Sequence, residues 1–203
     1  IGTGLQLCLY GLALLASSNI SNLIISNNLN VAMVVPYSIA YKLFNMAFNF
    51  LYGFNQASSP LLGKEYGEDN WDWIKKTYTN MVVFTVFLGS TILLGGVLFL
   101  KDIIGVWVGI EHYPGILIVI VLGLWFFCNG LSNINYTVIN SFNYTKGIAF
   151  VSWLEALIFI GVSLLLVNKI GVIAIPVGML CGSLCTSVWA LPYIVKKRSN
   201  RVL

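Results

Sequence analysis

The stretch Met81–Leu100, MVVFTVFLGSTILLGGVLFL, carries no charged side chain. The hydrocarbon core of a bilayer is about 30 Å thick, and roughly 20 apolar residues cross it as an α-helix. This stretch therefore predicts a transmembrane helix. The whole chain agrees, because 58% of its 203 residues are hydrophobic, 9% are charged and the mean hydropathy is +0.87. A soluble domain carries roughly 25% charged residues.

Further apolar runs of spanning length lie on both sides of this stretch, and the connectors between them are polar or contain Gly, Pro or Asn, which favour turns. We expect an all-α fold, a polytopic membrane helix bundle with about six transmembrane helices in a single lobe over residues 1–203. Because the chain starts at Ile1 without a signal-peptide pattern, we expect a piece of a longer chain. The expected spans are 3–25, 33–60, 81–100, 115–140, 148–167 and 172–195.

Cationic residues gather on one side of the expected bundle. If the spans alternate in direction, the other side holds only Lys101 and Lys169. Cytoplasmic segments carry the excess of Lys and Arg, so both ends of this segment are expected in the cytoplasm. The net charge of +4 then comes from lysines and arginines that face the anionic cytoplasmic leaflet. Membrane lipids are therefore an expected partner, and nucleic acid is not. The cations on the richer side are Lys64, Lys75, Lys76, Lys146, Lys196, Lys197, Arg198 and Arg201.

The connector 64–80, KEYGEDNWDWIKKTYTN, is the one sizeable extramembrane element expected. It is predicted to hold a short helix from Asp72 to Lys76, a charge order that suits the helix dipole. Its aromatic residues can rest at the headgroup level, with Lys75 and Lys76 toward anionic lipid. An interfacial elbow between two spans is favoured over a binding site.

The second expected span segregates its polar residues. At 100° per residue they share an arc of roughly 80°, so one face of this helix is not expected to touch lipid. Lys42 lies near the midplane, where a lysine costs about 2.5–3.5 kcal/mol on insertion scales and normally faces a cavity or a partner. The residues on this arc are Ser38, Lys42, Asn45, Asn49, Gly53 and Gln56.

Two other spans carry polar stripes, and the fifth carries Glu155, the only acidic residue inside an expected span. Such amides can act as helix–helix hydrogen bonds worth on the order of 0.6 kcal/mol each. Three stripes with a midplane lysine instead favour a water-filled vestibule. Glu155 is either a proton-linked group or the buried partner of Lys42. The predicted pathway residues are Lys42, Asn45, Asn49 and Gln56, with Asn19, Asn22, Asn129, Asn133 and Tyr136 opposite or adjacent.

The chemistry of this vestibule suits a sugar phosphate. Amides donate and accept hydrogen bonds as sugar hydroxyls require, and a lysine offers a point charge to phosphate. Neither a metal site nor an enzyme is expected, because the cysteines lie in apolar runs and His112 stands alone in a loop. No cofactor is expected either.

Four consecutive motifs carry a resemblance to a known family: NISNLIISNNLN (Asn19–Asn30), VVPYSIAYKLF (Val34–Phe44), SSPLLGKEY (Ser58–Tyr66) and GEDNWDWIKKTY (Gly67–Tyr78). They resemble the C-terminal six-helix half of O-antigen-type polysaccharide flippases, in the multidrug/oligosaccharidyl-lipid/polysaccharide exporter superfamily. Many members carry an acidic residue in the first helix of this half, where this chain has amides.

The resemblance implies one of two lobes around a central cavity, the N-terminal lobe being absent from these residues. The implied substrate is an undecaprenyl-pyrophosphate-linked oligosaccharide. It would cross the bacterial inner membrane by alternating access for lipopolysaccharide and other surface polysaccharide biosynthesis, driven by a proton or sodium gradient and working beside polymerase machinery. Three alternatives stay open: a multidrug/cation antiporter of the same superfamily, a membrane-embedded polysaccharide polymerase or ligase, and a non-transporting scaffold.

Overall fold

Helices make up nearly all of the part of the chain that the structure describes. The computed structural model describes residues 20–199, apart from the side chains of residues 145–147 and 197–199. No strand occurs among these residues, so the expected all-α fold is confirmed. After a helical segment at residues 20–28, the elements are η1 (Val31–Met33), α2 (Val34–Ala57), α3 (Ser59–Gly67), α4 (Trp71–Trp107), η2 (Ile110–His112), α5 (Ile116–Ser141), α6 (Thr145–Ile170), η3 (Gly171–Ile173), α7 (Ala174–Cys185) and α8 (Ser187–Ser199).

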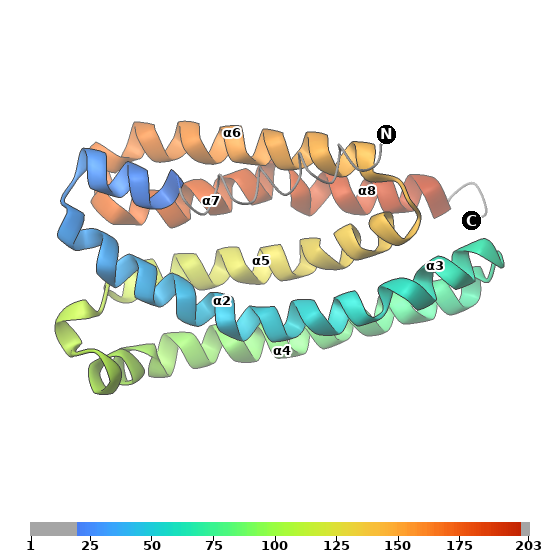
Figure 1. Ribbon diagram of the computed structural model, residues 1–203, viewed down its shortest axis with the longest axis horizontal. Coiled ribbons are helices and arrows are strands. Elements are labelled where there is room, and N and C mark those ends of the chain that lie inside the picture. The colour runs from blue at the N-terminus through green and yellow to red at the C-terminus, as the bar shows by residue number, and fades with distance from the viewer. Residues whose placement is uncertain (1–19, 200–203) are drawn as a thin grey trace.

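The helices lie nearly parallel in an elongated bundle, with α6 to α8 on one side, α2 and α4 on the other, and α5 between them (Figure 1). Four helical stretches of the described chain are long and apolar enough to cross a membrane: Val31–Gly67, Trp71–Trp107, Ile116–Ser141 and Ile148–Lys196. The last of these folds back on itself at η3. The chain is therefore a multi-pass membrane protein.

The helix α4 runs without interruption across the expected boundary between a connector and a span at Met81. Residues 71–80 were expected to lie in an interfacial elbow before a span that starts at Met81, but they are the first turns of one uninterrupted helix. Asn70 caps this helix by accepting a hydrogen bond from the backbone N–H of Trp73 at 3.4 Å, and Asp72 lies in the first turn. No Gly or Pro follows before Met81, so nothing interrupts the helix there.

The helices α6 and α7 pack closely because small residues lie at their interface. At Gly171 the chain leaves α6 with φ +67° and ψ −147°, a conformation that only glycine adopts readily, and α7 then returns antiparallel. A Cβ on Gly178 would collide with the Ser163 hydroxyl and lie 2.9 Å from the Phe159 carbonyl oxygen. Small residues spaced by four positions let helix backbones approach in this way.

The core of the bundle involves all its long helices, and its stacked aromatic rings lie between α2 and α5. Phe44 and Phe48 of α2 stack on Phe126 of α5, with ring centroids 5.8 and 5.4 Å apart. All three rings are buried, and they orient α2 by fixing which of its faces points inward. The opposite sides of α2 remain on the surface of the described bundle.

Candidate functional site

Three distinct faces run along α2. The inward face is apolar apart from Asn55 and a tyrosine hydroxyl, and it is buried against the bundle. A second face carries the polar stripe, and its residues Lys42, Asn49 and Gln56 are exposed. A third, exposed face is apolar and consists of Met46, Phe50 and Phe54, which are 76%, 74% and 48% exposed. The polar stripe is therefore separated both from the core of this lobe and from the apolar surface.

Hydrogen bonds involve the polar stripe at two places. The Ser38 hydroxyl donates to the Asn22 side-chain oxygen at 3.1 Å, which joins the helical segment 20–28 to α2. The Asn49 amide donates to the Asn45 oxygen at 2.8 Å, one turn away. The structure thus places Asn22 beside the stripe, and its part in a substrate pathway stays a prediction. Asn19, also predicted to line the pathway, lies outside the described residues.

Lys42 stands on this stripe as an exposed cation. Among the described residues, ion pairs join Lys64 to Glu68 and His112 to Glu111, and none involves Lys42. The interpretation of Glu155 as the partner of Lys42 is therefore not supported. The physical reason is position: Lys42 faces away from the bundle, whereas Glu155 of α6 faces α7 and α8.

The amides of α5 bond to neighbouring helices. Asn129 accepts a hydrogen bond from the Tyr52 hydroxyl at 3.0 Å, and Asn133 accepts one from the Asn55 amide at 3.3 Å. The Tyr136 hydroxyl lies 3.3 Å from that of Ser152 on α6. These contacts are of the helix–helix kind because α5 lies between the two sides of the bundle. A place for these residues in a substrate pathway stays a prediction.

A second polar cluster surrounds Glu155. Its carboxyl group interacts with the hydroxyls of Ser187, Thr186 and Ser183. These hydroxyls lie where α7 ends and α8 begins, and Thr186 also donates to the carbonyl of Gly182 at 2.7 Å. Hydroxyl side chains that bond to backbone carbonyls bend helices. The arrangement places an ionisable group next to a break in a membrane helix.

Sequence reasoning missed two parts of these sites. Ser183, Thr186 and Ser187 follow the i, i+3, i+4 spacing of one helix face, which was a usable signal. Asn55 gave no such signal, because it lies off the polar stripe on the inward face of α2. It is fully buried and donates to Asn133 and, at 3.5 Å, to Thr85.

Comparisons with known proteins agree with the helical fold. A solved structure described as the outward-facing conformation of a multidrug resistance MATE family transporter of the MOP superfamily has the same fold, with a TM-score of 0.81 over 96% of this chain and 13% sequence identity. The chain spans only 44% of the length of that protein. No curated protein sequence matches the present chain.

A family model described as MatE matches residues 7–165. This match supports the superfamily to which the sequence motifs pointed, while the O-antigen flippase subgroup and the assignment to the C-terminal half stay predictions. Since the matched residues make up most of the chain, the chain belongs to the MatE family.

Proposed function

We propose that this chain is one lobe of a transporter that moves a lipid-linked oligosaccharide across the bacterial inner membrane by alternating access. Membership of the MatE family and the fold shared with a MATE transporter support transport. The 44% coverage of that transporter supports a second lobe beyond these residues, as two-lobe architecture requires. The substrate proposed is an undecaprenyl-pyrophosphate-linked glycan destined for the cell surface.

The observation that carries this proposal is the exposed polar stripe of α2. A lobe on its own exposes the face that its missing partner would enclose, and on α2 that exposed face carries amides and Lys42. Amides suit sugar hydroxyls because each can donate and accept. A lysine ammonium suits pyrophosphate as a point charge. The stripe therefore offers weak, repeated contacts to a glycan and one stronger contact to its phosphates.

The Lys42→Ala substitution in the complete transporter tests the role of the charge. A hydrogen bond to a charged group contributes about 1.5–3 kcal/mol, so we expect surface glycan to fall by on the order of tenfold or more in cells that depend on this transporter. Lys101→Ala is the matched control, because Lys101 is also exposed but lies on α4 and not on the polar stripe of α2. Wild-type glycan levels in the Lys42→Ala cells would refute this role.

We propose Glu155 as the group that couples transport to a proton or sodium gradient. Its hydroxyl neighbours offer oxygen atoms to a cation and hydrogen bonds to a carboxylate. Glu155→Gln keeps the hydrogen bonding but removes the titrating proton, so it should flatten the dependence of transport on pH. Asp102→Asn is the control, since Asp102 is exposed near one end of the bundle. An unchanged pH profile in Glu155→Gln would remove the role in proton coupling, and an unchanged dependence on sodium would remove the role in sodium coupling.

Multidrug export is the second candidate, favoured by the described activity of the structurally similar MATE transporter. The polar face of α2 carries amides and a cation but no carboxylate, which suits a cationic drug poorly. Drug sensitivity of cells with and without the transporter separates the two candidates. If cells with the transporter are more drug-resistant than cells without it, and both carry the same amount of surface glycan, the substrate is a drug and not a lipid-linked glycan.

Orientation is part of the proposal. The turn between α3 and α4, the α5–α6 turn and the end of α8 lie at one end of the bundle, and that end carries the cation-rich segments (Figure 1). We place this end in the cytoplasm by the excess of Lys and Arg. Of two reporters fused after Ser199, the one that functions only in the cytoplasm should therefore be active, and the one that functions only on the other side of the membrane should be inactive.

A further inference from the structure

The helices α3 and α4 form a hairpin at one end of the bundle (Figure 1). With 37 residues, α4 is about 55 Å long, whereas the hydrocarbon core is about 30 Å thick. The Ser59 and Ser141 hydroxyls, 2.8 Å apart, place the start of α3 level with the end of α5. The hairpin therefore reaches from the end of the bundle into the headgroup region and beyond it.

Aromatic contacts fix the hairpin against α5. The Tyr66 ring stacks on Phe142 with centroids 4.1 Å apart, and Trp71 meets Tyr66 edge-on at 5.6 Å. Farther along α4, the Tyr78 hydroxyl donates to Asn135 at 3.0 Å. Because Asn135 lies within the last two turns of α5, the turn of α4 that precedes Tyr78 is held about level with the end of that helix. That turn carries Lys75 and Lys76.

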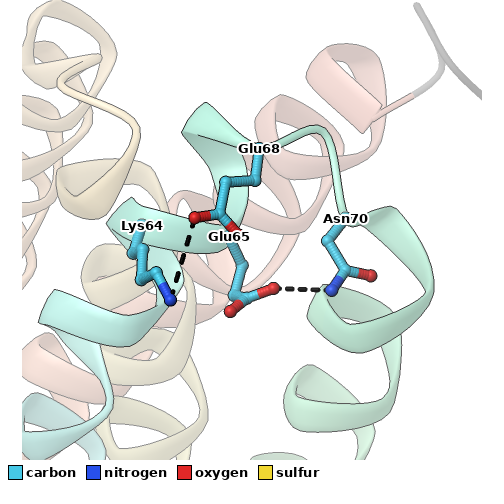
Figure 2. Close-up of polar contacts among 4 residues, drawn as sticks. All are labelled: Lys64, Glu65, Glu68 and Asn70. Atoms are coloured by element: carbon cyan, nitrogen blue, oxygen red, sulfur yellow. Dashed lines mark hydrogen bonds and ion pairs between the residues drawn. The ribbon is translucent and has the colours of Figure 1, made fainter.

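The charges of the hairpin are ordered along its axis. Acidic residues occupy the tip, and two of them are engaged there: Glu68 pairs with Lys64 at 3.7 Å and Glu65 accepts from the Asn70 amide at 2.6 Å (Figure 2). Nearer the bundle, Lys75 and Lys76 are exposed. Within residues 20–199, neither of these two lysines forms an ion pair with an acid, Asp72 one turn away included.

A third cation lies close by on α8. Val195 packs against the same apolar cluster as Tyr78 and Ile74, and the exposed Lys196 follows it directly. Two helices thus present lysines at one level, around the end of the bundle. We call Lys75, Lys76 and Lys196 the basic collar.

We propose that the basic collar binds the headgroups of anionic phospholipids. The cations lie about level with the end of α5, and headgroups surround a membrane protein at the ends of its spanning helices. The acidic tip lies farther from the bundle than the cations. A lysine near an anionic leaflet contributes attraction equivalent to about fivefold in binding. The collar is independent of the substrate pathway on α2 and would hold the hairpin end at a fixed depth in an anionic membrane.

The test uses the full chain in phosphatidylcholine bilayers that contain a minor fraction of phosphatidylglycerol. Native mass spectrometry counts the phosphatidylglycerol retained by wild type and by the variant Lys75→Ala/Lys76→Ala. We expect the variant's apparent affinity to fall by about 30-fold if the two lysines act independently, and the retention by wild type to fall with added salt. Lys75→Arg/Lys76→Arg should retain the lipid, since it preserves both charges.

Lys101→Ala/Lys169→Ala is the matched control, because it removes the same charge from exposed positions near the C-terminal ends of α4 and α6, away from the collar. Equal retention in the Lys75→Ala/Lys76→Ala variant and wild type would overturn the proposal. An equal loss in the control pair would do so too, because it would mean that net charge alone attracts lipid. Displacement of the lipid by inorganic phosphate at constant ionic strength would overturn the assignment to a bilayer headgroup.

Discussion

At the scale of single residues, a substitution at Gly178 tests the packing of α6 on α7. Gly178→Ala adds a methyl group where Ser163 and the Phe159 carbonyl leave no room. Overpacking of this kind costs about 1–3 kcal/mol, so we expect a lower midpoint of thermal unfolding in detergent. Unfolding can be followed by the loss of helical circular dichroism. A variant that melts at or above the wild-type temperature would contradict this packing.

Gly161→Ala is the control for that substitution. Gly161 lies on α6, the other helix of this pair, and a Cβ there would have no atom within 4 Å. Alanine is the better helix former by up to about 1 kcal/mol, so this variant should melt at or slightly above the wild-type temperature. The sequence shows both glycines within apolar runs, and only the position of the facing helix distinguishes them.

At the scale of elements, the start of α4 depends on a single cap. The Asn70 side chain accepts from the backbone N–H of Trp73 and donates to Glu65 of α3 (Figure 2). Asn70→Ala removes both bonds, and the loss of a cap costs about 1 kcal/mol. We expect the amide of Trp73 to exchange hydrogen about fivefold faster, with no change in α5.

Asn80→Ala provides the comparison for this cap. Asn80 is an exposed residue inside the same helix, and alanine there should leave exchange at Trp73 unchanged. If Asn70→Ala also leaves it unchanged, the aromatic cluster around Trp71 rather than the cap holds the end of the helix. The continuous start of α4 would then depend on these ring contacts and not on its cap.

The elements also show how far the sequence can predict this molecule. The helical period sorts the faces of one helix without reference to its neighbours, so the polar stripe of α2 could be predicted and is exposed. It cannot say which helix a face meets. The similar stripe of α5 turns toward α2 and α6, where Asn133 and Tyr136 find partners. The cluster around Glu155 required a second helix in the same way.

At the scale of the whole molecule, α2 has two exposed faces, and we expect the polar face to border water and the apolar face to border the hydrocarbon of the membrane. Exposure alone does not distinguish them, because Phe50 on the apolar face is 74% exposed and Asn49 on the polar face is exposed as well. A thiol reacts with a charged maleimide only where water allows the thiolate to form. Asn49→Cys and Phe50→Cys are neighbours in sequence and therefore form a matched pair.

The complete transporter in its membrane, with its native cysteines replaced by serine, is the sample for this labelling. We expect Lys42→Cys, Asn49→Cys and Gln56→Cys to react at least about tenfold faster than Met46→Cys and Phe50→Cys, because thiolate formation is suppressed in hydrocarbon. Each modified fraction can be measured by intact-mass spectrometry. Slow reaction along both faces would mean that α2 borders no water-filled pathway. Faster reaction at Phe50→Cys than at Asn49→Cys would mean that the apolar face, and not the polar face, borders water.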